Sequence, residues 1–176
     1  MRAAFVAMFA FLIPSVASAF DVPARKAGLW QMTMTFEGSH IPQTTMKHCI
    51  DAATDKKMNS LGGEMQKENC SKQDMQRVGN TIVVDSVCKS GMGGTSVSHA
   101  VVTGDFNRAY TVKADIKREG GAMPGMPANH EMKMTVDAKW LGPCAADQKP
   151  GDMIMANGMK MNINNLPSMG GGMPRR

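Results

Sequence analysis

The sequence predicts a mainly β fold: a strongly curved antiparallel sheet or a partly open barrel of about seven strands, with one short helix and two disulfides. Two observations carry this prediction. Several segments alternate apolar and polar residues with a period of two, which is typical of strands with one buried and one exposed face. Turn residues, mainly Gly, Pro and Asn, separate these segments. Because every strand has one polar face, the sheet is expected to wrap a core, with the helix plugging one end.

The amino terminus has the pattern of a secretory signal peptide. Arg2 provides a positive charge, residues 3–16 form an apolar stretch, and residues 17–19 are the small residues of a cleavage site. This stretch is shorter than the roughly 20 apolar residues that a membrane-spanning helix needs. After cleavage near Ala19, the protein is expected in the periplasm or the secreted fraction.

The sequence divides the chain into three parts. Residues 1–19 are interpreted as the signal peptide, residues 20–144 as one disulfide-linked β domain, and residues 145–176 as an irregular extension with a disordered tail rich in Gly, Met and Pro.

The first two strands are predicted at residues 28–38 and 44–50, on either side of a turn that contains Pro42. A short helix is predicted next, over residues 51–61. Asp51 can cap its first turn, and Gly62 and Gly63 are expected to end it. Its apolar stripe consists of Ala52, Ala53, Met58 and Leu61.

Five further strands are expected after the helix. Residues 70–77 and 81–89 form a hairpin around Gly79 and Asn80, which tolerate the backbone of a tight turn. The remaining three strands are predicted at residues 95–103, 109–117 and 132–140. For residues 153–161 the pattern leaves two alternatives, a small hairpin or an irregular wrap.

The cysteines predict structural disulfides. The chain has four, Cys49, Cys70, Cys88 and Cys144, and none of them forms a Cys-x-x-Cys pair of the kind that zinc and redox sites use. Four cysteines allow three connectivities. The favoured one joins Cys49 to Cys70 and Cys88 to Cys144, and its rival joins Cys70 to Cys88 across the hairpin.

Composition argues against a nucleic-acid partner. The formal charge is +5, with basic and acidic residues interspersed, and aromatic residues make up 5% of the chain. A nucleic-acid-binding surface is typically a basic run or a stacking platform, so no nucleic acid is expected. No transmembrane segment is expected in the mature chain. A monomer is expected, and the sequence identifies no partner.

The histidines and methionines suggest one metal site. The chain contains 19 methionines. A Met-rich loop precedes a His-x-Met element, and Met134 follows this element on the same predicted strand. Thioether and imidazole groups are ligands that suit Cu(I). The candidate ligands are Met123, Met126, His130 and Met132. The sequence predicts no cofactor. Copper is the alternative.

An apolar ligand is the other specific possibility. A curved sheet with an apolar inner face can hold a small hydrophobic molecule if about 300 Å³ or more of its interior is empty. The side chains expected to line that interior are Trp30, Met32, Met34, Tyr110, Val112, Met134 and Trp140. The alternative is that they fill the core. No catalytic constellation is recognisable, so an enzyme is not expected.

Short motifs carry a resemblance to a known family. They are the Gly28-Leu29-Trp30 opening, Cys49 before the helix, and the Trp140-Leu141-Gly142-Pro143-Cys144 ending. With Cys70 and Cys88 they resemble the bacterial domain-of-unknown-function 3617 family of small exported proteins, over roughly residues 27–144. The resemblance implies a periplasmic location and a β-rich fold with disulfides, and it implies no catalytic residues.

The sequence therefore predicts an exported β domain of unknown biochemical role, as a binding or structural module of the cell envelope. The first alternative is Cu(I) binding in the periplasm, and the second is a carrier of a small apolar ligand.

Overall fold

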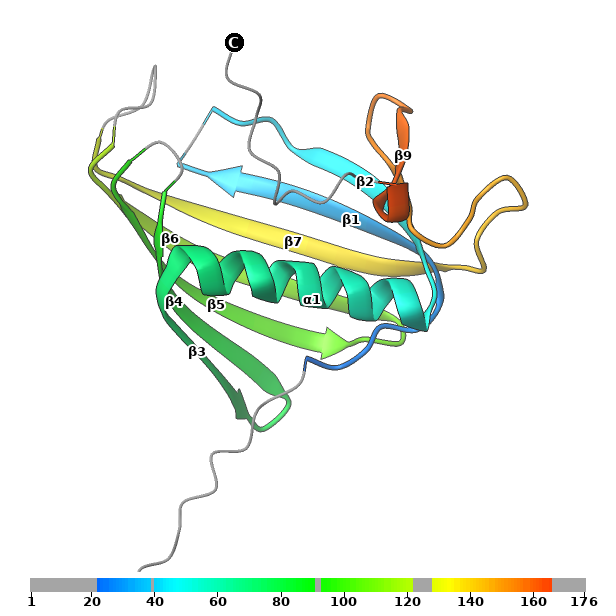
Figure 1. Ribbon diagram of the computed structural model, residues 1–176, viewed down its shortest axis with the longest axis horizontal. Coiled ribbons are helices and arrows are strands. Elements are labelled where there is room, and N and C mark those ends of the chain that lie inside the picture. Colours follow the sequence, from blue (N-terminus) through cyan, green and yellow to red (C-terminus); the bar gives the residue numbers. More distant parts are fainter. Residues whose placement is uncertain (1–21, 39, 91–92, 122–127, 166–176) are drawn as a thin grey trace, which may run out of the picture.

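Nine strands and one long helix make up the fold in the computed structural model, which describes residues 22–38, 40–90, 93–121 and 128–165 (Figure 1). The elements are β1 (Gly28–Glu37), β2 (Thr44–Ile50), α1 (Ala52–Asn69), β3 (Cys70–Val78), β4 (Thr81–Lys89), β5 (Thr95–Asp105), β6 (Ala109–Glu119), β7 (His130–Gly142), β8 (Asp152–Ile154), β9 (Lys160–Asn162) and the 3₁₀ helix Ile163–Asn165. The seven strands predicted from period-two alternation are all present.

The strands form one antiparallel sheet in the order β3-β4-β5-β6-β7-β1-β2-β8-β9. The mainly β, antiparallel class is therefore confirmed, but two details of the prediction are wrong. The sheet has nine strands rather than about seven, and it is open, neither closed into a barrel nor strongly curled. The helix accounts for the difference, because it covers the apolar face that a barrel would otherwise have to enclose.

Helix α1 is longer than predicted and lies along one face of the sheet rather than plugging an end (Figure 1). Asp51 caps it as expected, accepting from Thr54 N at 2.7 Å, while Thr54 Oγ1 accepts from Asp51 N at 2.8 Å. Gly62 and Gly63 do not end it, because glycine weakens a helix by only about 1 kcal/mol relative to Ala. Good helix formers follow both glycines, so α1 continues to Asn69. The side chain of Leu61 lies outside what the structure describes.

The core lies between α1 and the sheet. Trp30 is completely buried and forms a cluster with Ile50, Tyr110 and Ala138. The rings of Trp30 and Tyr110 lie 5.6 Å apart. Trp30 pairs with Trp140 on β7 and with His48 on β2, so these side chains share the face that α1 covers.

The carboxyl-terminal part of the described chain adds to the sheet. Of the two alternatives for residues 153–161, the hairpin is the one found, because β8 pairs with β2 and with β9. Residues 145–165 are thus less irregular than predicted. The expected disordered tail, residues 166–176, lies outside the described residues, as does the predicted signal peptide.

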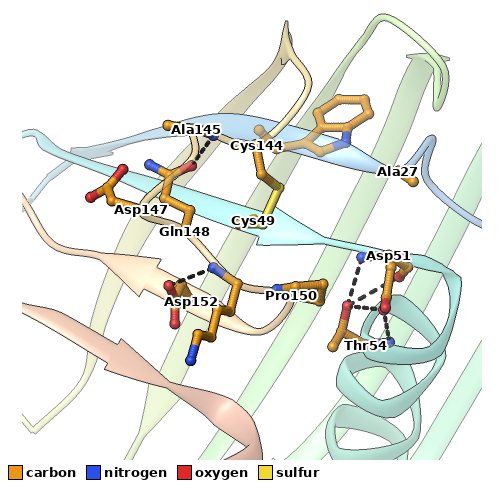
Figure 2. The surroundings of a disulfide bond; sticks show 12 residues. Ala27, Cys49, Asp51, Thr54, Cys144, Ala145, Asp147, Gln148, Pro150 and Asp152 are labelled. Atoms are coloured by element: carbon orange, nitrogen blue, oxygen red, sulfur yellow. Dashed lines mark hydrogen bonds between the residues drawn. A yellow bond between two sulfur atoms is a disulfide. The ribbon is translucent and has the colours of Figure 1, made fainter.

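The disulfides are Cys49–Cys144 and Cys70–Cys88. The favoured pairing was therefore wrong and its rival, across the β3–β4 hairpin, is correct. Cys70 and Cys88 are register partners on neighbouring strands. Cys49, the residue before the last one of β2, lies beside the residues that follow β7 (Figure 2). The sequence did not show that α1 carries the chain from one side of the sheet to the far edge, which places Cys49 and Cys70 on distant strands.

Candidate functional site

A cavity of about 330 Å³ lies between α1 and the apolar face of the sheet. Its walls come from the segment before β1, from α1 and from strands β1 to β6. Apolar side chains dominate the walls, and only a few polar groups interrupt them. The lining residues are Val22, Pro23, Arg25, Met32, His48, Met58, Asn59, Met75, Ile82, Val84, Val102, Phe106, Tyr110 and Val112. Val22 and Asn59 are exposed, so this part of the lining borders solvent.

A buried ion pair stands at this cavity. Arg25 Nε donates to Asp55 Oδ1 at 2.7 Å, and the backbone N of Arg25 donates to Asp55 Oδ2 at 2.9 Å. The two side chains are only 8% and 1% exposed. Asp55 lies in the first turn of α1, where the positive end of the helix dipole also favours a carboxylate. The pair fixes the segment before β1 to the helix.

The edge of the Arg25 guanidinium that Asp55 does not occupy faces the sulfur atoms of two methionines. Nη1 lies 4.0 Å from Met32 Sδ, and Nη2 lies 3.6 Å from Met58 Sδ. Thioethers are weak acceptors. Both methionines line the cavity, so this edge of Arg25 is directed toward it. Burial raises the pKa of the nearby Tyr110 hydroxyl, and the charge of Arg25 partly opposes that rise.

His48 is the unusual residue of the cavity. It is 5% exposed, and neither of its ring nitrogens has a hydrogen-bond partner among the described residues. Buried polar groups are normally paired, so an orphan of this kind needs an explanation. Burial, followed by the charge of Arg25, lowers the pKa of His48 from 6.5 to about 4. At neutral pH the imidazole is therefore uncharged, with one donor and one acceptor nitrogen.

This burial makes stability depend on pH. The unfolded chain binds a proton at His48 near pH 6.5, whereas the folded chain does so only near pH 4. Between these values the unfolded state holds more protons, so the free energy of unfolding decreases as the pH falls. The total loss is about 3 kcal/mol, at 1.36 kcal/mol per pKa unit. Urea denaturation across this range is expected to show the decrease, and His48→Leu to remove it.

Two features make the pH window diagnostic. The carboxyl pKa values of Asp51, Asp105 and Asp152 lie below their ordinary value of 3.8, so the stability they contribute is lost mainly below about pH 4. His40→Gln, at an exposed histidine, is the matched control and is expected to retain the decrease. A wild-type protein with constant stability from pH 7 to 4 would contradict the burial of His48.

The residues predicted to line an apolar interior all lie on the sheet face that α1 covers, as their register shows. Three of them, Met32, Tyr110 and Val112, line the cavity. Trp30 belongs to the core beneath it. Trp140 packs against that core, and its Nε1 donates to Ala27 O at 3.0 Å. Met34 and Met134 lie farther along the same face and are not part of the lining.

The predicted copper ligands are only partly described. His130 and Met132 lie two residues apart on β7, so their side chains point to the same face. Met123 and Met126 lie outside the described residues. Within the described ranges, no group of three or more His, Cys, Asp or Glu side chains is placed to hold a metal ion. Copper binding by these four residues stays a prediction.

A larger hollow of about 580 Å³ lies elsewhere, beside Glu37, Val97 and Met132. Its charged side chains pair with one another. Lys133 Nζ lies 3.4 Å from Asp115 Oδ1, and these side chains are 70% and 66% exposed. We regard this hollow as a surface groove, because the ion pairs in its lining are solvated and contribute little binding energy.

Sequence reasoning missed the polar residues that make the cavity distinctive, namely Arg25, His48 and Asp55, whereas Met58 was placed on the apolar stripe of the predicted helix. One signal was available for His48. In the strand over residues 44–50 it lies two residues before Ile50, at a core-facing position. Arg25 precedes the first strand and carries no pattern of its own. Its partner Asp55 is separated from it by 30 residues.

The sequence motifs near the start and the end of the domain contact each other where β1 pairs with β7. Gly28 has a φ of +131°, and a Cβ there would lie 2.6 Å from Trp140 Nε1 and also meet Gly142 O. Trp30 Nε1 donates to Lys26 O at 2.8 Å, and Lys26 Nζ lies 3.7 Å above the Trp140 ring. The Gly-Leu-Trp opening and the Trp-x-Gly ending therefore serve packing between β1 and β7.

The fold and the cavity define a class: a disulfide-linked domain in which one helix covers an open antiparallel sheet and a cavity remains between the two layers. The family model for the protein of unknown function DUF3617 matches residues 25–144, and the chain belongs to this family. No curated protein matches the chain. No solved structure matches it either. In the described part of the chain, no helix has the length and apolar character needed to cross a membrane.

Proposed function

We propose that this domain binds a small, largely apolar molecule in the cavity between α1 and the sheet. The observation that carries the proposal is the cavity itself. About 330 Å³ is accessible between the helix and the sheet, with an opening to solvent beside Val22 and Asn59. That volume falls in the range of small-molecule sites, which are mostly apolar with a few placed polar groups.

The cavity favours binding over catalysis. A catalytic histidine is usually oriented by a hydrogen-bonded carboxylate. Within the described ranges His48 has no such partner. Its nitrogens are instead available to a ligand. The proposed setting is the cell envelope. The two disulfides support it because they persist in oxidising compartments, and the signal-peptide pattern of residues 1–19 adds to that support.

A series of straight-chain alcohols from butanol to decanol tests the proposal by isothermal titration calorimetry. Each added methylene is expected to raise the affinity about fourfold, since burying one CH₂ contributes about 0.8 kcal/mol. The rise is expected to stop at about ten non-hydrogen atoms, at about 30 Å³ for each. An affinity that does not change with chain length contradicts the proposal.

Two valines on one strand provide a matched pair of variants. Val102 lines the cavity, whereas its neighbour Val101 points to the opposite face of β5 and pairs with Lys113. Val102→Phe is expected to fill part of the cavity and weaken the binding of the longer alcohols at least about tenfold, while Val101→Phe leaves it unchanged. Equal effects of the two variants would place the binding site elsewhere.

A further inference from the structure

We infer that the molecule bound in this cavity is a carboxylic acid with a short alkyl chain, whose carboxylate is held by the guanidinium edge of Arg25 and by His48. This inference deepens the proposed function and depends on it, because it names the head group of the ligand that the cavity binds.

The first argument is the edge of the Arg25 guanidinium that Asp55 does not occupy, near which the Tyr110 hydroxyl also interacts with Arg25. Asp55 occupies Nε, at 2.7 Å. The other edge, formed by Nη1 and Nη2, has the thioethers of Met32 and Met58 as neighbours. Two parallel N–H donors match the two oxygens of a carboxylate, which is a far stronger acceptor than a thioether. The edge faces the cavity, so a carboxylate placed there exchanges weak contacts for strong ones.

The second argument is the orphaned imidazole. His48 lines the same cavity and its nitrogens have no partner among the described residues. Its neutral form carries one N–H, which can donate to a carboxylate oxygen. Arg25 and His48 line the same cavity of about 330 Å³, so one small head group is placed between them in this inference. A ligand oxygen would satisfy a group that the fold leaves unsatisfied.

Charge balance selects a monoanion. Asp55 already neutralises Arg25. A bound carboxylate adds one negative charge, and His48 can neutralise it by taking up one proton from solvent. The charged or titratable groups that line the cavity with His48 are Arg25 from the segment before β1 and Tyr110 from β6, and Asp55 from α1 pairs with Arg25. A phosphate dianion would leave a second buried negative charge without a partner.

The size of the cavity limits the alkyl chain. At about 30 Å³ per non-hydrogen atom, 330 Å³ holds about ten such atoms. Octanoate has this size, and octanamide has nearly the same shape without the charge. The two compounds therefore separate recognition of the head group from simple filling of the cavity.

Calorimetric titration of the full chain with octanoate and octanamide tests the inference. Octanoate is expected to bind at least about tenfold more tightly at neutral pH, because hydrogen bonds to charged groups are stronger than neutral ones. At about pH 5.5, above the pKa of about 4 at which the folded chain protonates His48, titrations in buffers of different ionisation enthalpy are expected to show proton uptake with octanoate. His48→Leu is expected to abolish that uptake.

The matched variant removes both charges of the buried pair together. Arg25→Leu with Asp55→Leu leaves no uncompensated charge, so the fold is expected to persist. This double variant is expected to lose the preference for octanoate over octanamide, because the guanidinium that distinguishes the two head groups is gone. Arg108→Leu, at an exposed arginine, is the control that should retain the preference.

The outcomes separate the two proposals. Binding of alcohols and octanamide with no preference for octanoate overturns the carboxylate inference and leaves the proposed function in place. A preference for octanoate that survives in the Arg25→Leu, Asp55→Leu variant also overturns the inference, because the head group then lies elsewhere. Failure of all these compounds to bind overturns the proposed function, and the inference with it.

Discussion

Replacing Cys49 and Cys144 together by alanine is expected to lower the free energy of unfolding by about 4.7 kcal/mol. The bridge joins residues separated by 95 positions. In the chain-entropy model, a cross-link restricts the unfolded chain more strongly as the loop it closes becomes longer, and a loop of about 100 residues gives about this value. The loss is comparable to the whole stability of a marginal domain, about 5 kcal/mol.

The position of the bridge adds a structural reason. In the sheet, β1 lies between β7 and β2. Cys49 belongs to β2 and Cys144 follows β7, so the disulfide joins the two neighbours of β1 (Figure 2). The backbone N of Gly151 also donates to Cys49 O at 2.8 Å, which fixes the chain just before β8. Loss of the bridge therefore loosens the strands that carry Trp30 and His48.

The matched control is the second disulfide. Cys70 and Cys88 are separated by only 18 positions, and the β3–β4 ladder already holds them as partners. Replacing both by alanine is expected to cost about 3 kcal/mol. Urea denaturation of the wild type and the two double variants measures the difference. Equal losses for the two bridges would show that the length of the closed loop does not set their contributions.

The strands were predictable because each one has its own local pattern. In β6, Tyr110, Val112 and Ala114 alternate with Thr111 and Lys113, and the sheet places the first set toward the helix and the second toward the other face. Period two depends on the strand alone, so it needs no knowledge of the neighbouring strand. The capped start of α1 was predictable for the same reason, since Asp51 and Thr54 bond each other within one turn.

The order of the strands was not predictable from these patterns. The end of α1 depends on whether Gly62 and Gly63 stop the helix, which tertiary context decides. The favoured pairing of Cys49 with Cys70 would join the two strands that flank the helix, and the length of α1 keeps these strands apart. The full helix spans about 27 Å at 1.5 Å per residue, which is enough to cover a sheet face. That length explains both the open sheet and the observed pairing.

The cavity was harder still to foresee. Its polar groups come from the segment before β1, from β2, from α1 and from β6, and no local spacing links Arg25, His48, Asp55 and Tyr110. Their assembly depends on where α1 crosses the sheet. What the sequence did provide was the apolar face itself, on which Met32, Tyr110 and Val112 lie.

Asp55→Leu is expected to lower the free energy of unfolding by about 3–5 kcal/mol, because it leaves the buried Arg25 charge without its partner. The Arg25→Leu, Asp55→Leu variant is expected to recover most of that loss, since neither charge then has to be buried. A double-mutant cycle built from denaturant unfolding of both single variants and the double variant gives the coupling between the two residues. Lys133→Ala is the control at a solvated pair, with Asp115, and is expected to cost less than about 1 kcal/mol. A loss of that small size for Asp55→Leu would mean that water reaches the Arg25–Asp55 pair, and it would remove the fixed guanidinium on which recognition of a carboxylate depends.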